Sequence, residues 1–126
     1  MKSTNYNLLK NALDASSLRQ RVISGNLSNL NTPGYKVNKV EFEKHLKEAG
    51  EGAALRKTDD RHFGAGNIGE VQGTVEKRQF TAYNENGNNV DVDLEMTEMA
   101  ANELYYSTLI SLLNSKYSKI NSAINK

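Results

Sequence analysis

Apolar side chains recur at helical spacing near the start of the chain. Steps of four and three residues visit Leu9, Leu13, Ser16, Gln20, Ile23, Leu27 and Leu30. Five of these seven positions are apolar, which predicts an amphipathic helix from about residue 5 to residue 30 with a polar middle at Ser16 and Gln20. Pro33 and Gly34 end the pattern, because proline lacks the amide donor and disfavours helix at the residue before it.

A longer stripe occupies the C-terminal segment. Its nine positions, in alternating steps of three and four, are Met96, Met99, Glu103, Tyr106, Ile110, Leu113, Tyr117, Ile120 and Ile124. Eight of the nine are apolar or tyrosine, and residues 90–126 contain neither glycine nor proline. The pattern predicts one long helix with a coiled-coil seam of about five heptads, widened by Leu109 and Leu112.

The middle of the chain differs in character from both ends. Seven of the nine glycines lie between Gly50 and Gly87, where apolar residues are sparse. We expect a short helix over residues 39–48 and a short strand over residues 71–75. The chain is accordingly divided into an N-terminal helix and turn (1–36), an intervening arm (37–89) and a C-terminal coiled-coil helix (90–126).

Two amphipathic helices at opposite ends of one chain are expected to pair with each other. The sequence therefore predicts a mainly α fold, an antiparallel hairpin of two long terminal helices with a small irregular, β-containing region between them. One partner helix cannot cover a stripe as wide as the C-terminal one, so apolar surface should remain for neighbouring copies. Isolated subunits are then expected to be partly disordered and to complete their burial on assembly.

Composition limits the classes of function. The 126 residues carry 16 basic and 15 acidic side chains, and a net charge of +1 gives no long-range attraction to nucleic acid or an anionic membrane. Cysteine is absent, which excludes disulfides and thiolate metal sites. No stretch approaches the roughly 20 apolar residues of a membrane span, and the N-terminus lacks the pattern of a cleaved signal peptide.

Candidates for catalysis or metal binding are few. His45 and His62 have no nearby serine nucleophile and no ligand spacing, and the glycine-rich segment lacks the P-loop pattern. Asp91, Asp93 and Glu95 precede the C-terminal stripe, where acids cap a helix and complement its dipole more often than they bind a metal. The sequence therefore predicts no catalytic residue, no cofactor and no metal site.

The most specific segment lies where the N-terminal helix is expected to end, Gly25-Asn26-Leu27-Ser28-Asn29-Leu30-Asn31-Thr32-Pro33-Gly34-Tyr35-Lys36. Pro33 and Gly34 stand at the central positions of a type II turn, and Asn26 and Asn29 are placed to bond the backbone near the helix end. The segment resembles the asparagine-rich signature of flagellar rod, hook and hook-associated proteins. The matching residues are Asn26, Asn29, Asn31, Thr32, Pro33, Gly34 and Tyr35. Leu27 and Ser28 depart from the family pattern, which has isoleucine and alanine there.

A second resemblance begins before the C-terminal stripe. The string Gly87-Asn88-Asn89-Val90-Asp91-Val92-Asp93-Leu94-Glu95-Met96 is similar to the opening of the C-terminal helix in the proximal-rod member of the same family. Asn102, Leu104 and Tyr106 continue the similarity. The Arg-x-Tyr-Glu-Ala-Asn stretch that is usual in other rod and hook proteins is absent.

Two shorter patterns are also similar to elements of that family. Phe42 and Leu46 fit a Phe-x-x-x-apolar pattern with which rod and hook-type export substrates engage the flagellar type III export gate; a short amphipathic helix explains the pattern equally well. Thr58 and His62 faintly resemble a Thr-x-x-x-His element of proximal-rod proteins.

The resemblance implies a structural subunit of the proximal flagellar rod. Such subunits are exported by the flagellar type III system without a cleaved signal peptide, and they polymerise into the periplasm-spanning tubular shaft that transmits torque from motor to hook. The implied partners are further copies, other rod proteins, the protein at the junction of the MS ring and the rod, and the export gate, with no nucleic acid and no direct lipid binding. The alternative is a helical-hairpin needle or adaptor of another secretion apparatus, which would not be expected to carry Asn-x-Asn-Thr-Pro-Gly-Tyr.

On this interpretation, helix pairing and assembly depend on the two stripes. The hypothesised seam consists of Leu9, Leu13, Ile23, Leu27 and Leu30 from the first helix and Met96, Met99, Tyr106, Ile110, Leu113, Tyr117, Ile120 and Ile124 from the last.

Overall fold

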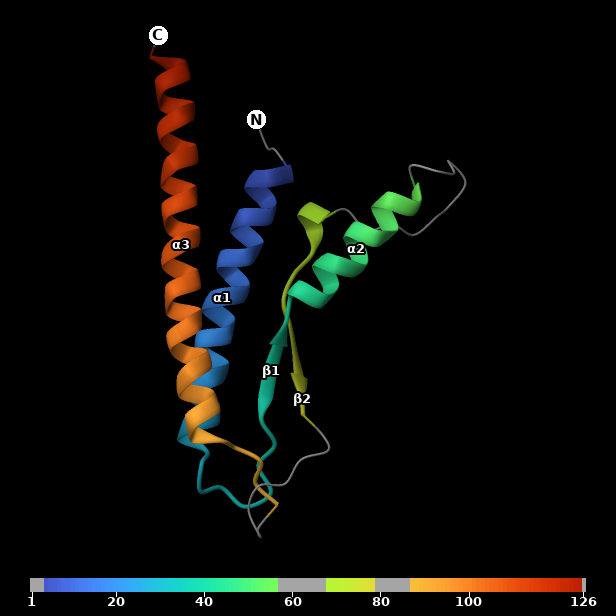
Figure 1. Ribbon diagram of the computed structural model, residues 1–126, viewed down its shortest axis with the longest axis vertical. Coiled ribbons are helices and arrows are strands. Elements are labelled where there is room, and N and C mark those ends of the chain that lie inside the picture. The colour runs from blue at the N-terminus through green and yellow to red at the C-terminus, as the bar shows by residue number, and fades with distance from the viewer. Residues whose placement is uncertain (1–3, 57–67, 79–86, 126) are drawn as a thin grey trace.

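Two long helices form the body of the molecule (Figure 1). The computed structural model describes residues 4–56, 68–78 and 87–125. Helix α1 spans Thr4–Ser28 and helix α3 spans Val92–Ile124. They pack side by side and antiparallel, so that α1 begins and α3 ends at the same end of the molecule. The predicted fold class, a mainly α helical hairpin with a small β-containing region, is confirmed.

The ends of both helices follow from local sequence. After α1, the backbone amide of Tyr35 donates to the carbonyl oxygen of Thr32 (3.2 Å) and Gly34 has a φ of +71°, so the predicted type II turn is confirmed. Before α3, the carboxylate of Asp91 accepts a hydrogen bond from the backbone amide of Leu94 (3.2 Å), which confirms its predicted capping role.

The intervening region forms a small annex beside α1. Strand β1 (Asn38–Glu41) pairs antiparallel with β2 (Thr74–Lys77), helix α2 spans Glu43–Arg56, and a short 3-10 helix η1 spans Ile68–Glu70. The predicted helix over residues 39–48 is therefore wrong in its first half. Val40 and Phe42 are both buried while Lys39 is exposed, an alternation that suits a strand.

The apolar core lies around α1, which is packed between α3 and the annex. Its buried residues are Ala12 and Ala15 from α1, Phe42 from the turn before α2, and Leu109 from α3. Partly buried side chains that pack against them are Leu8, Leu9, Leu13, Leu46 and Val71. Small residues on α1 allow elements on both sides to approach it closely.

Gly73, just before β2, lies where the annex approaches α1 most tightly. A Cβ atom at this position would stand 3.1 Å from Cγ1 of Val40 and 3.2 Å from Cβ of Ala15. We expect Gly73→Val to lower the free energy of unfolding by about 1–3 kcal/mol, because a side chain there overpacks the core. Urea unfolding followed by circular dichroism measures this. Gly50→Ala is the control, since a Cβ on Gly50 meets nothing within 4 Å and alanine favours helix; equal loss in both variants would contradict the packing argument.

Candidate functional site

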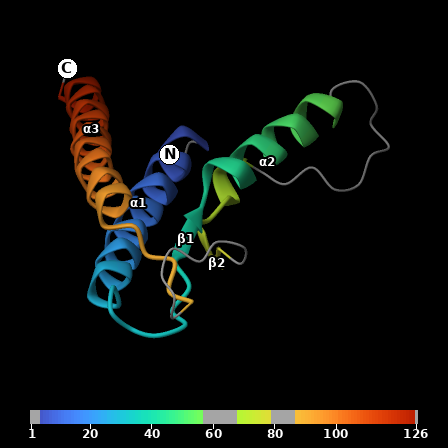
Figure 2. The same ribbon diagram turned by 60° about the horizontal axis from the view of Figure 1, so that its bottom comes forward.

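The two segments that carry the resemblance meet at the closed end of the hairpin (Figure 2). Asn26, buried in the last turns of α1, is the centre of this junction. Its Nδ2 donates to the carbonyl oxygen of Asn38 (2.9 Å) and to Oε2 of Glu95 (3.0 Å). Its Oδ1 accepts from the backbone amide of Asn38 (3.0 Å) and the hydroxyl of Tyr35 (3.2 Å). The full hydrogen-bonding capacity of one carboxamide thus joins α1, β1 and α3. The expectation that Asn26 bonds the backbone near the end of its own helix is wrong.

The side chain of Asn88, far along the chain from α1, forms hydrogen bonds with the turn that follows α1. Its buried Nδ2 lies 2.7–3.0 Å from the carbonyl oxygens of Asn29, Leu30 and Thr32. These three carbonyls belong to the turn that follows α1, which ends at Ser28, so the Asn88 amide binds the backbone of that turn. Its Oδ1 accepts from the backbone amide of Val90 (2.8 Å).

Asn89 ties the same segment to the annex. Its Oδ1 accepts from the backbone amide of Val37 (2.6 Å), and its Nδ2 donates to the carbonyl oxygen of Arg78 (3.1 Å). The sequence indicated only that Asn88 and Asn89 belong to a turn, and it gave their side chains no partner. The signal that could have found them is a pair of asparagines beside a helix cap, whose side chains suit loop carbonyls and amides.

The remaining residues of the asparagine-rich motif lie nearer the surface. Asn29 donates from Nδ2 to the carbonyl oxygen of Gly25 (2.7 Å), which confirms its predicted bond to the helix end. Its Oδ1 accepts from the hydroxyl of Thr32 (3.0 Å). The side chains of Asn31, Thr32 and Pro33 are exposed, as is Gly34.

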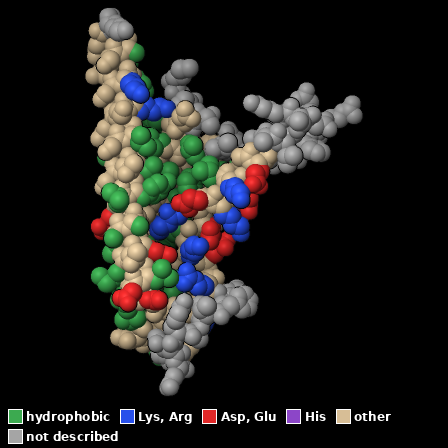
Figure 3. Space-filling view, viewed as in Figure 1, with side chains coloured by type: hydrophobic (Ala, Val, Ile, Leu, Met, Phe, Trp, Pro, Cys, Tyr) green, Lys and Arg blue, Asp and Glu red, His purple; other side chains and the backbone are tan. Residues whose placement is uncertain are grey.

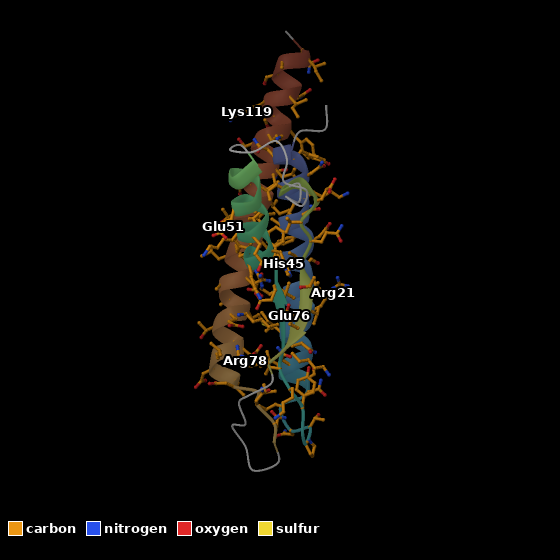
Figure 4. All side chains as sticks on the ribbon, turned by 90° about the vertical axis from the view of Figure 1, so that its right-hand side faces the viewer. Arg21, His45, Glu51, Glu76, Arg78 and Lys119 are labelled. Atoms are coloured by element: carbon orange, nitrogen blue, oxygen red, sulfur yellow. The ribbon has the colours of Figure 1, made fainter. Side chains whose placement is uncertain are left out.

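Glu95 is a carboxylate buried at this junction. Burial raises the pKa of its carboxyl, the nearby charges of Glu98 and Asp91 act in the same direction, and the Asn26 hydrogen bond and the positive charge of Arg78 oppose them. Arg78 is labelled in Figure 4, near the end of the molecule where α3 begins. The prediction that Glu95 serves the helix dipole is incomplete, because its side chain also bonds Asn26 within the packed interface.

The raised pKa makes the stability of the hairpin depend on pH. A raised folded-state pKa contributes stability that is present below the ordinary value of 4.5 and is lost as pH rises through the folded-state pKa. Glu95→Gln removes this loss, so we expect the variant to gain stability relative to the parent between about pH 4 and pH 7. Thermal unfolding across this range measures the difference. A pH-independent difference, or the same trend in the exposed control Glu76→Gln, would contradict the assignment.

Along α3, the buried line passes through Glu95, Asn102 and Leu109, which are seven residues apart. The predicted stripe flanks this line. Of its residues, Met99, Ile110 and Leu113 are half-buried, whereas Met96, Tyr106, Tyr117, Ile120 and Ile124 are exposed. On α1, Ile23 is buried and Leu9, Leu13, Leu27 and Leu30 are half-buried.

Of the large hydrophobic side chains that are exposed in the described part of the chain, all but Val75 come from α3. In Figure 3, hydrophobic side chains gather between α3 and the annex, and others are scattered along α3. Its large exposed hydrophobic residues are Met96, Leu104, Tyr105, Tyr106, Leu112, Tyr117, Ile120 and Ile124. The set is distributed around the helix as well as along it, because a helix turns by about 100° per residue and Leu104, Leu112 and Ile120 therefore point in different directions. We use the name α3 apolar face for the whole set. Its extent agrees with the expectation that α1 cannot cover the whole stripe, and surfaces of this kind mark sites of association.

The export-pattern residues lie in and beside the core. Phe42 is 1% exposed, and Leu46 is half-buried against the same cluster. The neighbouring Glu43 forms an ion pair with Arg19 of α1 (2.7 Å), and this pair holds the start of α2 to the hairpin. The charge and hydrogen bond of Arg19 lower the pKa of the Glu43 carboxyl against the effect of burial, which raises it.

Sites for other chemistry are sparse in the described part of the chain. His45 shares a hydrogen bond with the hydroxyl of Thr74 (2.8 Å), and residues 4–56, 68–78 and 87–125 hold no group of three His, Asp or Glu that could bind a metal. His62 and Thr58 lie outside the described residues.

A groove of about 570 Å³ between α1, β1 and α3 is lined by residues such as Val22, Val40 and Tyr105. None of the described helices combines the length and hydrophobicity needed to cross a membrane.

The described structure is a helical hairpin with exposed apolar side chains along α3 and a hydrogen-bonded polar junction at its closed end. Residues 7–36 match the family described as Flagella basal body rod protein. The flagellar basal body rod protein FlgB of Bacillus subtilis (strain 168) is 37% identical over 116 residues, which cover 92% of this chain and 89% of that protein. The flagellar basal body rod protein FlgB of Borreliella burgdorferi is 34% identical over 117 residues, which cover 86% of this chain and 87% of that protein. The protein of the same name from Aeromonas hydrophila is 34% identical over 116 residues, which cover 90% of this chain and 86% of that protein. The chain belongs to the FlgB family of flagellar basal body rod proteins.

Proposed function

We propose that the protein is a structural subunit of the flagellar basal body rod, and that it works by polymerising with further copies and with other rod proteins. The observation that carries this proposal, beside the family, is the α3 apolar face. Eight large apolar or tyrosine side chains lie exposed along one helix, a surface that a lone subunit would leave in water.

The proposed assembly is an open tube that transmits torque from the motor to the hook. A face on one subunit that contacts a different face on the next makes a heterologous contact, which generates helical filaments or tubes when the rotation does not close. Long helices nested side by side would resist twisting of such a shaft. The proposed partners include the protein at the junction of the MS ring and the rod.

We also propose export by the flagellar type III system without a cleaved signal peptide, followed by assembly into the periplasm-spanning rod. If Phe42 and Leu46 engage the export gate, they must do so before folding, because the folded subunit buries Phe42 in its core. The proposal includes no nucleic acid and no direct lipid contact.

A structural role is further favoured over catalysis. The groove beside β1 presents Arg19, Glu43 and Glu98 among apolar side chains, and its lining residues include no histidine or serine. The buried carboxamide of Asn26 joins α1 to β1 and α3, and its hydrogen-bonding capacity is already saturated by these contacts.

The assembly role is tested by a charge on the α3 apolar face. Ile110 and Leu113 are half-buried, so replacing them with aspartate would disturb folding and assembly together; Leu112 is 53% exposed and separates the two. We expect Leu112→Asp to leave the urea midpoint of the purified subunit unchanged and to abolish motility in a strain that lacks its own copy. The matched control is Ser111→Asp, an exposed polar neighbour that should still support swimming. A swimming Leu112→Asp strain with intact rods would argue against this surface as an assembly contact.

A further inference from the structure

A layer of polar side chains crosses the packed interface between α1 and α3 at mid-height. Ser16 is fully buried and Asn102 is 5% exposed. The hydroxyl of Ser16 donates to Oδ1 of Asn102 (3.0 Å), and Nδ2 of Asn102 donates back to the carbonyl oxygen of Ser16 (2.9 Å) and to Oε1 of Gln20 (2.9 Å). Ser16 and Gln20 are the two polar positions in the α1 stripe, and both bond Asn102 in the buried line of α3.

The layer distinguishes between alternative pairings of the two helices. Sliding α3 by seven residues would bring Leu109 or Glu95 to the level of Ser16. Leu109 would leave the buried polar groups unsatisfied, and Glu95 would add a second buried charge there. A buried group without its partner costs more than the made hydrogen bond contributes, so both slipped registers are disfavoured. A single buried asparagine is known to set register in coiled coils in this way.

The apolar pattern alone sets the register of this hairpin weakly. The α3 stripe, which flanks the buried line, repeats every three and four residues, so a shift by one heptad leaves apolar stripe residues beside α1. The buried line itself changes at every level, because Glu95, Asn102, Leu109 and Lys116 follow one another at seven-residue steps. Two α3 helices could also pair through their stripes. That pairing would bury Asn102 against apolar side chains instead of against Ser16 and Gln20.

We propose that Ser16, Gln20 and Asn102 are specificity-determining residues that select α1 as the partner of the buried side of α3 and fix their register. Pairing with α1 covers the buried side of α3, and the register fixes which levels along α3 leave the α3 apolar face uncovered for neighbouring subunits. The inference rests on the proposed role in assembly, because a single register is needed for every copy to present the same face. The polar layer fixes the register of α1 and α3, and the α3 apolar face provides the contacts with neighbouring subunits.

The test replaces the layer with apolar side chains and reads the register by crosslinking. The chain has no cysteine, so Tyr6→Cys with Tyr117→Cys gives a single thiol pair; the parent hydroxyls are 3.3 Å apart and the ring centroids 6.3 Å apart. Tyr6→Cys with Ile124→Cys reports a slip of one heptad. A short bismaleimide is applied to the purified full-length protein with and without Ser16→Ala and Asn102→Leu, and thermal unfolding is measured on the same samples.

We expect the layer variant to melt at the same or a higher temperature than its parent. The intrachain crosslinking yield of the Tyr6→Cys, Tyr117→Cys pair, divided by that of the Tyr6→Cys, Ile124→Cys pair, should nevertheless fall by about tenfold. Crosslinks between two chains should increase. An unchanged ratio overturns the proposal whatever the stability. A changed crosslink ratio together with a lower melting temperature also overturns it, because the layer would then stabilise the hairpin in general instead of selecting its register. Neither result depends on rod formation, which the Leu112→Asp strain tests separately.

Discussion

Replacing Asn26 with aspartate is expected to destabilise the closed end of the hairpin by about 3–5 kcal/mol at neutral pH. The substitution sets a second carboxylate 3.0 Å from Oε2 of Glu95 and directs an acceptor at the carbonyl oxygen of Asn38, where the amide had donated to both. Native domains are stable by about 5–15 kcal/mol, so such a loss would remove a large share of the subunit's free energy of unfolding. Urea unfolding, followed by the helical circular dichroism signal, measures the change in the free energy of unfolding.

The pH dependence and a matched control make the Asn26 experiment specific. Two facing carboxylates are relieved when one of them binds a proton, so the loss in Asn26→Asp should shrink as the pH falls below about 5. Asn31→Asp makes the same chemical change at an exposed position of the same motif, and it should stay within about 0.5 kcal/mol of the parent. Equal effects at both positions would mean that the junction does not depend on the Asn26 carboxamide.

Replacing Phe42 with alanine is expected to lower the free energy of unfolding by about 3–5 kcal/mol, because it empties the largest fully buried site in the described part of the chain. The cavity would open between Ala12, Ala15 and Leu109 and would loosen the annex from α1. Val75→Ala, which shortens a half-exposed side chain on β2, should change stability by about 0.5 kcal/mol or less. A similar loss in both variants would contradict the placement of Phe42 in the core.

The same substitution separates the core role of Phe42 from the proposed role in export. Ile23→Ala also removes a buried side chain, at an expected loss of about 2–5 kcal/mol, but lies outside the Phe-x-x-x-apolar pattern. If the pattern engages the export gate, secretion into the culture medium should fall for Phe42→Ala and stay near normal for Ile23→Ala. Equal secretion of the two variants would remove the export role and leave Phe42 as a core residue.

Local periodicity was sufficient to predict the long helices, because each is amphipathic over its length and is bounded by its own turn or cap. Pro33 and Gly34 end the first pattern, and Asp91 caps the last helix. The same reasoning failed at β1, where Val40 and Phe42 suit a short strand as well as a helix. Only pairing with β2 and burial against α1 decided between these two readings.

The roles of the motif residues were not predictable in the same way. The sequence marked Asn26, Asn88 and Asn89 as parts of two strings, far apart along the chain. Their hydrogen bonds run to Glu95, to the turn after α1 and to Val37, so each role depends on where a distant segment comes to lie. Likewise, Ser16 and Gln20 interrupt the apolar stripe of α1 and become partners only when Asn102 is opposite them.

The sequence by itself determined which segments are helical, that both terminal helices carry an apolar side, and that one of these sides is too wide for its partner. These properties depend on spacing between near neighbours, which the chain carries in any conformation. The tertiary structure decided the register of the hairpin, the saturated junction around Asn26 and which flank of α3 stays exposed. Those features depend on contacts between distant residues, such as Asn26 with Glu95 and Ser16 with Asn102, and such contacts exist only once the helices are packed together.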